Sequence, residues 1–371
     1  MEQPIRIAHV IGKLEAAGVE AVVNNYYLNI DRNKYQFDYF IHENSTGKPD
    51  QSLIDLGARY YYIPRWRNVI GQVTKMYKIF KQNQYQIVHV HMNSLSFSAL
   101  FAAKLAGVPV RICHSHNTSD IKETLRTFIK MCMKPFASLP ATHLAACSRY
   151  AGEWLFGKKK VENGEVKIIT NAIDRSKYQY NEEIRKNRRE TYMVSYDTTV
   201  VGHVGRICKQ KNQTMLLRIF AEYHKNINPK SVLWIIGNGN CNKLLKLAED
   251  LGINDCVAFF GMRPDVNELY QAMDVLLMPS WYEGFCLAVL EAECAGLPVV
   301  ASDVLCEEVI VSPDMHLLSL KVPETYWAKA VDEMSKKPRT NTIDERYEIK
   351  IAAKDLEQYY DSLLDGIKNN E

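Results

Sequence analysis

Two series of short apolar runs, each separated by segments with helical spacing, constrain this chain more than any other feature. In the first series the runs occupy residues 5–11, 37–42, 58–63, 87–91, 110–114, 142–148 and 166–170. Amphipathic segments such as residues 18–30, 69–82 and 95–106 lie between them. Strands that alternate with helices of this length are typical of a parallel, doubly wound sheet. The sequence therefore predicts an α/β fold.

The second series begins after a polar, highly charged segment at residues 174–196. Its apolar runs occupy residues 200–205, 232–237, 258–260, 275–278 and 298–301. A chain of 371 residues is too long for one ordinary α/β core, so we expect two domains with a boundary near Ile173. The last segment, residues 344–367, is predicted to form a long amphipathic helix.

Charge and cysteine usage narrow the functional class. Residues 1–171 contain 22 basic and 13 acidic residues, whereas the remainder contains 24 basic and 30 acidic residues. Such asymmetry suggests different partners for the two halves, but nothing resembles a nucleic-acid recognition module, so no nucleic acid is expected. The nine cysteines form no C-x-x-C pair and no cluster at zinc spacing, which favours reduced thiols and a cytoplasmic location. No apolar segment approaches the ~18 residues that span a bilayer, and no signal peptide is expected.

Residues 279–303 contain the most specific pattern. A helix is predicted at residues 285–294, and a Gly-Leu-Pro sequence ends it. Glu283 lies just before this helix, and Glu291 lies within it. At ~1.5 Å rise per residue the two carboxylates would lie roughly 12 Å apart, with the anion-binding first turn between them. A nucleotide sugar has hydroxyls at both ends and phosphates between, which suits this arrangement. The alternative is that each glutamate is a solvated residue that merely favours the helix dipole.

This pattern resembles the carboxylate signature of retaining glycosyltransferases of family four, which have the two-domain GT-B fold. The resemblance extends over nearly the whole chain. It implies two Rossmann-like, doubly wound parallel-sheet domains facing a cleft, with the C-terminal helix crossing back to the first domain. We expect an acceptor-side domain at residues 1–172, plus the helix at about 350–371, and a nucleotide-sugar-binding domain at residues 173–349.

A second element of the resemblance concerns phosphate binding. The turn that contains Arg206 and Lys211 is similar to the family's G-R-x-x-x-x-K-N element, whose Arg and Lys bind the donor diphosphate and stabilise it as it leaves. Basic residues at a helix start are otherwise often only solvated. The sequence has no D-x-D motif, so the metal–diphosphate chelate of GT-A enzymes is not expected and neither metal nor cofactor is predicted.

The resemblance assigns further residues to the donor site. Glu283 would hold sugar hydroxyls and Glu291 the ribose, while the segment around Met262 would hold the base through backbone groups. Gly18 belongs to a segment similar to the family's G-G-x-E loop, with Ala17 where the first glycine is usual. The remaining donor-site candidates lie in glycine turns or in the loop and helix that contain the two glutamates: Gly237, Gly239, Gly284, Phe285 and Leu287.

His114 and His116 end a predicted strand, and alternation should direct both side chains to the same side. A buried core or capping role is the common alternative for such a histidine. The family places one histidine here, close to the transferred sugar. We favour His116 as the catalytic residue, because it lies later in the strand, and keep His114 as the alternative.

Details at residues 18–27 and 114–119 are most similar to bacterial exopolysaccharide and capsule enzymes. The resemblance implies a retaining, metal-independent hexosyl- or N-acetylhexosaminyltransferase that uses a nucleoside-diphosphate sugar, most often a uridine one. Its acceptor would be a glycan or a polyprenyl-diphosphate-linked sugar. Two alternatives remain open, namely a nucleotide-sugar epimerase of the same fold and a non-enzymatic two-lobed sugar-binding protein.

Basic and aromatic residues mix at residues 59–67 and 126–136, and Lys75, Lys78 and Lys81 follow at helical spacing. This mixture favours an anionic membrane surface and predicts peripheral binding to the inner leaflet. The alternative is an ordinary solvated face whose aromatic residues belong to the core.

Overall fold

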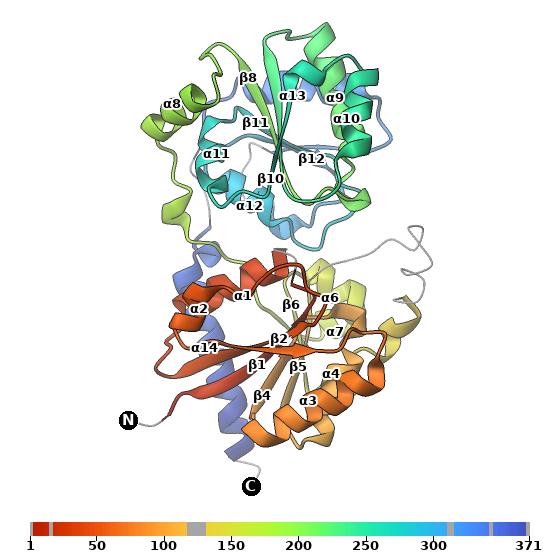
Figure 1. The fold of residues 1–371 in the computed structure, drawn as a ribbon, viewed down its shortest axis with the longest axis vertical. Coiled ribbons are helices and arrows are strands. Elements are labelled where there is room, and N and C mark those ends of the chain that lie inside the picture. The colour runs from red at the N-terminus through yellow and green to blue at the C-terminus, as the bar shows by residue number, and fades with distance from the viewer. Residues whose placement is uncertain (1–2, 15–17, 117–130, 310–314, 341–343, 369–371) are drawn as a thin grey trace. The chain divides into compact units, whose positions relative to one another are not determined.

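The computed structural model describes residues 3–14, 18–116, 131–309, 315–340 and 344–368. The chain divides into two compact units, one formed by Met1–Ile173 with Glu345–Glu371 and the other by Asp174–Asp344 (Figure 1). Each unit contains one sheet, and all strand pairs between the named strands are parallel. The predicted α/β class with two parallel-sheet domains is confirmed.

The first unit has seven strands in the order β3-β2-β1-β4-β5-β6-β7. In chain order they are β1 (Ile5–Gly12), β2 (Tyr35–His42), β3 (Arg59–Ile63), β4 (Ile87–Val90), β5 (Val110–Ser115), β6 (His143–Ala146) and β7 (Val166–Ile168). The helices are α1 (Gly18–Asn29), α2 (Gln51–Asp55), α3 (Val69–Asn83), α4 (Phe97–Leu105), α6 (Arg149–Phe156), α7 (Lys158–Glu162) and α14 (Ile349–Lys368).

Strand alternation gives the two faces of this sheet different chemistry. Val88 and Val90 of β4 belong to an apolar core that α3 and α4 complete. His89 lies between them in sequence and therefore points to the opposite face, where its Nδ1 lies 2.9 Å from the hydroxyl of Tyr360 on α14. Figure 1 shows α14, the last helix, running along this sheet. A second contact joins Tyr35 of β2 to Asp361 of α14 at 2.6 Å.

The second unit has six strands in the order β10-β9-β8-β11-β12-β13. They are β8 (Thr199–Val204), β9 (Ser231–Ile236), β10 (Val257–Gly261), β11 (Val275–Met278), β12 (Val299–Ser302) and β13 (Met315–Leu318). The helices are α8 (Glu182–Thr191), α9 (Gln213–Asn226), α10 (Asn242–Asp250), α11 (Val266–Ala272), α12 (Leu287–Cys294) and α13 (Glu324–Ser335). The interior residues of β8, β9 and β11 pack with α9 and α13 in one apolar cluster.

The helix α8 was not predicted, because its sequence lies in the charged segment that marks the boundary. The side chain of Asn181 caps its first turn by accepting hydrogen bonds from two backbone amides. Arg188 then pairs with Glu268 of α11, and Arg185 lies 2.5 Å from Asp274. Ion pairs of arginine with acidic residues, rather than an apolar face, attach this helix to the rest of the second unit. Hydrophobic periodicity therefore does not predict it.

No helix in the described part of the chain is both long and apolar enough to cross a bilayer. All nine cysteines are free thiols, as their sequence spacing predicts.

Candidate functional site

Three loops meet at the carboxyl ends of β8, β9 and β10 in the second unit, which is the edge where open α/β sheets bind ligands. Backbone hydrogen bonds join Gly205 N to Ile236 O at 2.9 Å and Gly237 N to Gly261 O at 2.8 Å. Gly237 has φ +146°, and a Cβ there would lie 2.0 Å from the carbonyl oxygen of Gly205. Only glycine permits this close approach. Gly239 has similarly little room, because a Cβ added there would lie 2.6 Å from the Cβ of Ile207.

Buried polar side chains hold the loop that contains Arg206. Gln213, the first residue of α9, donates from Nε2 to the carbonyl oxygen of Arg206 at 2.8 Å and accepts from the Cys208 amide at 3.3 Å. His203 lies beneath it, with Nε2 3.2 Å from Gln213 and Nδ1 2.9 Å from the carbonyl oxygen of Leu277. The Arg206 side chain itself is exposed. Sequence reasoning missed His203 and Gln213, although they fix the backbone beneath the predicted phosphate-binding residue.

The structure brings two of the predicted residues, Lys211 and Glu283, into direct contact. Lys211 Nζ lies 2.7 Å from Glu283 Oε1 and 3.7 Å from the sulfur of Cys286. The exposed fractions of the Lys211 and Glu283 side chains are 15% and 6%. Burial alone would lower the pKa of Lys211, but Cys286 and the Glu283 carboxylate outweigh it and raise that pKa overall. The lysine is therefore a fixed positive charge.

Gln210 attaches the Glu283 loop to the Lys211 turn. Its carbonyl oxygen accepts from the Trp281 amide at 2.8 Å, and its Nε2 donates to the carbonyl oxygen of Tyr282 at 2.9 Å. Backbone and side-chain bonds thus hold two loops that lie far apart in the sequence. Such double attachment fixes the orientation of the Lys211–Glu283 pair before any ligand binds.

The second carboxylate, Glu291, lies in α12 in a different environment. Tyr270 donates a hydrogen bond to its Oε2 at 3.0 Å, and the side chain of Tyr178 also hydrogen-bonds to it. Burial raises the pKa of Glu291 to about 7, and the bonds from Tyr270 and Tyr178 only partly oppose this shift. Neither tyrosine was predicted; both lie outside the two-carboxylate segment.

The predicted boundary of this helix is wrong at its start. α12 begins at Leu287, with Cys286 as its N-cap residue, instead of at Phe285. Glu283 lies in the loop before the helix, as predicted, and helical rise applies only to the part of the segment from Leu287 to Glu291. Of the neighbouring candidates, Gly284 and Phe285 are buried and Leu287 is partly exposed, whereas Met262, after β10, has an exposed fraction of 64%.

The remaining candidates belong to the first unit. Gly18 is exposed at the start of α1, while residues 15–17 of the same predicted loop lie outside the described residues, as do residues 117–119 after the histidines. The rings of His114 and His116 stack with centroids 3.9 Å apart, so both point the same way, as alternation predicts. Both are buried.

Three further histidines surround this pair and were not predicted as site residues. They are His9 of β1 and His89 and His91 at the end of β4. The signal was present, because His89 and His91 repeat the alternating spacing of His114 and His116. What the sequence alone does not show is that β4 lies between β1 and β5, which places all five side by side.

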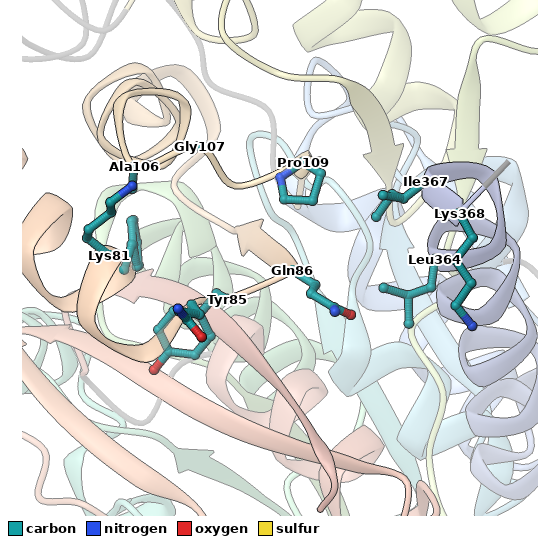
Figure 2. A pocket seen from close by; sticks show the side chains of 11 residues that line it. Lys81, Tyr85, Gln86, Ala106, Gly107, Pro109, Leu364, Ile367 and Lys368 are labelled. Atoms are coloured by element: carbon teal, nitrogen blue, oxygen red, sulfur yellow. The ribbon is translucent and has the colours of Figure 1, made fainter. Parts of the chain in front are cut away.

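A pocket of about 470 Å³ also lies in the first unit, lined by the ends of α3, α4 and α14 (Figure 2). Gln86 and Pro109, which line it, come directly before β4 and β5. It therefore lies at the amino ends of these strands, away from the histidines, and we do not assign it to the donor site.

Comparison with known proteins identifies the family. The profile of Glycosyltransferase Family 4 matches residues 16–177, and that of Glycosyl transferases group 1 matches residues 185–354. A Bacillus subtilis (strain 168) protein with the name "Putative glycosyltransferase EpsF" is 31% identical over 88% of this chain and 86% of its own length. The Escherichia coli UDP-Gal:alpha-D-GlcNAc-diphosphoundecaprenol alpha-1,3-galactosyltransferase is 27% identical over 81% of this chain and 80% of its own.

Solved structures agree in fold. The structure of Anabaena Alr3699/HepE in complex with UDP and glucose has a TM-score of 0.80 at 18% identity, covering 96% of this chain and all of that one. WaaG, a glycosyltransferase involved in lipopolysaccharide biosynthesis, has a TM-score of 0.71 over 96% of this chain and 95% of its own. The two matched profiles, the EpsF relationship and these folds together show that the chain belongs to glycosyltransferase family 4 and is a glycosyltransferase with the GT-B fold.

Proposed function

We propose that this enzyme transfers a hexose or N-acetylhexosamine from a UDP-sugar to a glycan or a polyprenyl-diphosphate-linked sugar during exopolysaccharide or capsule assembly. The reaction proceeds with retention and without a metal ion. The single observation that carries this proposal is the preorganised Lys211–Glu283 pair, held next to the glycine-lined loops of the second unit.

Departure of the diphosphate requires positive charge, because negative charge develops on the leaving oxygen. Lys211 supplies a buried, fixed ammonium group, and Arg206 supplies an exposed guanidinium on the same loop. A guanidinium binds phosphate oxygens in a bidentate manner, whereas an ammonium acts as a point charge. We infer that these two residues replace the divalent cation that other transferases place on the diphosphate.

The two carboxylates have separate roles in this proposal. Glu283 accepts hydrogen bonds from hydroxyls of the transferred sugar, and its contact with Lys211 places that sugar beside the diphosphate. Glu291 accepts from the ribose hydroxyls, while Tyr270 orients its carboxylate. No enzymic carboxylate acts as the nucleophile. The departing diphosphate takes the proton of the acceptor hydroxyl, and the bond to the acceptor forms on the same face of the sugar.

Three observations support the donor and acceptor classes. Alr3699/HepE was solved with UDP and glucose and with UDP-glucose. The Escherichia coli relative is named for UDP-galactose and a diphosphoundecaprenol acceptor. The Staphylococcus aureus relative CapH, at 22% identity over 96% of this chain, is named for capsular polysaccharide biosynthesis. We propose that the second unit binds the donor, and that the first binds the acceptor and contributes His116 or His114 beside the sugar.

The first unit also supports peripheral membrane binding on the cytoplasmic side. Apolar side chains are exposed on α3 and α4, which pack together: Ile70 is 83% exposed and Leu105 is 53% exposed. Lys75 and Lys78 are exposed on α3. Tyr60 and Tyr61 instead pack against Tyr39 and Phe40, so part of the predicted aromatic cluster belongs to the core. Residues 126–130 of the second predicted cluster lie outside the described residues.

A panel of nucleotide sugars tests the proposed donor. A bound donor stabilises the folded enzyme by mass action, so the melting temperature should rise with UDP-sugars more than with the GDP or ADP analogues. The stabilising sugar is then incubated with the enzyme and a diphosphoundecaprenol-linked acceptor, and the anomeric configuration of the product is determined by NMR. A product of inverted configuration, or stabilisation only by non-uridine donors, would contradict the proposal.

A further inference from the structure

Five buried histidines gather on one face of the first sheet, and the proposed transfer uses at most two of them. They come from three adjacent strands: His9 of β1, His89 and His91 at the end of β4, and His114 and His116 at the end of β5. Each has an exposed fraction of 6% or less. His9 and His89 are direct partners in the register of β1 and β4. So many imidazoles in one buried region require a chemical explanation.

The first row of contacts begins on α14. The hydroxyl of Tyr360 lies 2.9 Å from Nδ1 of His89, and Nε2 of His89 lies 2.9 Å from Nδ1 of His114. Both nitrogens of His89 are therefore used. Nε2 of His114, at the end of this row, is buried and has no hydrogen-bond partner.

The second row contains the other three histidines. Nδ1 of His9 lies 3.0 Å from Nε2 of His91, and Nδ1 of His91 lies 2.7 Å from Nε2 of His116. The outer nitrogens, His9 Nε2 and His116 Nδ1, are buried and unpartnered. Three neutral imidazoles carry three hydrogens, and two of these form the two bonds. One end of the row therefore always has an unpaired N–H, and the other end an unpaired lone pair.

Unpartnered buried polar atoms are costly, and a bound ion is one of the reasons for which a protein retains them. Burial, followed by the charge of neighbouring histidines, lowers the pKa of His91 and His114 well below the ordinary value. Burial also lowers the pKa of His116, to about 3. Neutral imidazole is the form that binds metals, through the nitrogen that carries no hydrogen.

We propose that His91, His114 and His116 form a binding site for one divalent transition-metal ion of the zinc, cobalt or nickel class. One nitrogen from each of the three lies within 4.8 Å of the others. Bonds of about 2.1 Å in tetrahedral geometry place ligand nitrogens about 3.4 Å apart. The 2.7 Å contact between Nδ1 of His91 and Nε2 of His116 therefore has to open slightly to admit the ion, and the hydrogen of His116 moves from Nε2 to Nδ1. Neutral imidazoles suit these ions, whereas Mg²⁺ and Ca²⁺ require oxygen ligands.

The surrounding contacts support this ligand set. Metal-binding histidines donate their second N–H to a hydrogen-bond acceptor, which fixes the ring. If His114 binds through its unpartnered Nε2, its Nδ1–H donates to His89, and His89 in turn donates to the oxygen of Tyr360. If His91 binds through Nδ1, its Nε2–H donates to Nδ1 of His9. Two of the three ligands thus have a ready outer partner.

A second possible group, formed by His9, His89 and His91, is less suitable. Both nitrogens of His89 already have hydrogen-bond partners, and only His9 contributes an unpartnered nitrogen. In the chosen group His114 offers its unpartnered Nε2, and the contact between Nδ1 of His91 and Nε2 of His116 supplies the other two ligand atoms. The site lies in the first unit, whereas the proposed diphosphate-binding residues lie in the second. Two of the proposed ligands, His114 and His116, are also the histidines proposed to lie beside the transferred sugar, whereas the positive charge for departure of the diphosphate is assigned to Lys211 and Arg206.

Direct binding measurements test the site without any sugar donor. The full chain is freed of metal by dialysis against EDTA and then titrated with Zn²⁺ by calorimetry and with Co²⁺ by visible absorption. We expect one ion per chain and an intense Co²⁺ spectrum typical of tetrahedral coordination. X-ray absorption of the zinc complex should show three imidazole ligands, a measurement that needs no variant. Failure of the wild-type chain to bind one ion, or coordination without imidazole, would overturn the proposal.

Variants then identify the ligands. His116→Gln and His91→Gln should each weaken Zn²⁺ binding more than 100-fold, and His9→Gln should weaken it 10- to 100-fold by removing an outer partner. His143→Gln is the matched control, because His143 lies on β6, partly exposed and outside both groups. Circular dichroism establishes that each variant is folded. Full binding by folded His116→Gln, combined with loss in His9→Gln, would contradict this ligand set.

Discussion

The ammonium nitrogen of Lys211 lies 2.7 Å from Oε1 of Glu283, although the two residues are 72 positions apart. Both side chains are largely buried, and Gln210 holds their two loops together. Removing one member of such a pair leaves an uncompensated buried charge, which costs more than the pair contributes. This contact therefore links the stability of the second unit to the geometry of the proposed donor site.

Lys211→Ala should reduce both stability and turnover. Loss of the ammonium group removes the 2.7 Å ion pair from the buried Glu283 carboxylate, so unfolding free energy should fall by about 3–5 kcal/mol. Turnover should fall strongly, because the leaving diphosphate loses a positive charge. Denaturant unfolding and donor-turnover assays measure the two effects.

Arg206→Ala separates catalysis from stability on the same loop. Arg206 is exposed, so this substitution should change the melting temperature little and still lower turnover strongly. Wild-type turnover in a folded Arg206→Ala enzyme would show that this guanidinium does not contact the diphosphate.

The two glutamates should give different kinetic defects. Glu291→Ala is expected mainly to weaken donor binding, whereas Glu283→Ala is expected mainly to lower turnover. Loss of a charge-assisted hydrogen bond should cost about 1.5–3 kcal/mol in each case. Donor affinity is measured by calorimetry and turnover under saturating donor. Unchanged values in both variants would rule out the assignment of this segment to the donor.

The sequence predicts the α/β fold because the periodic spacing of apolar residues in strands and helices is a local property. The same reasoning missed α8, whose attachment depends on Arg188 and Glu268 rather than on apolar residues. It also misplaced the start of α12, since the N-cap Cys286 makes no side-chain hydrogen bond that a sequence signature could reveal. The order of the strands in the sheet brings the five histidines together, and this order cannot be predicted from the local spacing of residues. Long-range contacts such as Lys211–Glu283 likewise require the folded chain.

Stability should depend on pH through Glu291. Its pKa is raised from 4.5 to about 7 in the folded protein, mainly by burial. The stability that this shift contributes is fully present below about pH 4.5 and is lost as the pH rises through about 7. Between pH 5 and pH 8 the free energy of unfolding of Glu291→Gln should therefore fall less than that of wild type. The difference between the two decreases should be at most about 3 kcal/mol.

Denaturant unfolding at several pH values measures this difference. Glu249→Gln is a matched control, because Glu249 is exposed on α10. Parallel pH profiles for wild type and Glu291→Gln would show that Glu291 is ionised at ordinary pH in the folded protein.

Chelation should leave the transfer reaction largely intact. In the proposed mechanism Lys211 and Arg206 carry the positive charge that stabilises the leaving diphosphate, so 5–10-fold excess EDTA over trace metal should not lower the initial rate by more than about twofold. Initial rates with a UDP-sugar are compared before and after chelation. Abolished activity that Mg²⁺ or Mn²⁺ restores would contradict the metal-free mechanism.

Membrane binding is the last expectation, and it rests on α3. Ile70 and Val69 are exposed at the start of this helix, and Lys75 and Lys78 are exposed farther along it. Each well-placed cation near an anionic surface contributes about 1 kcal/mol, so the protein should float with phosphatidylglycerol vesicles at low salt and remain at the bottom at high salt. Lys75→Glu combined with Lys78→Glu should abolish flotation, whereas Lys243→Glu on α10 of the second unit should not. Wild-type protein that stays at the bottom at low salt would favour a soluble acceptor.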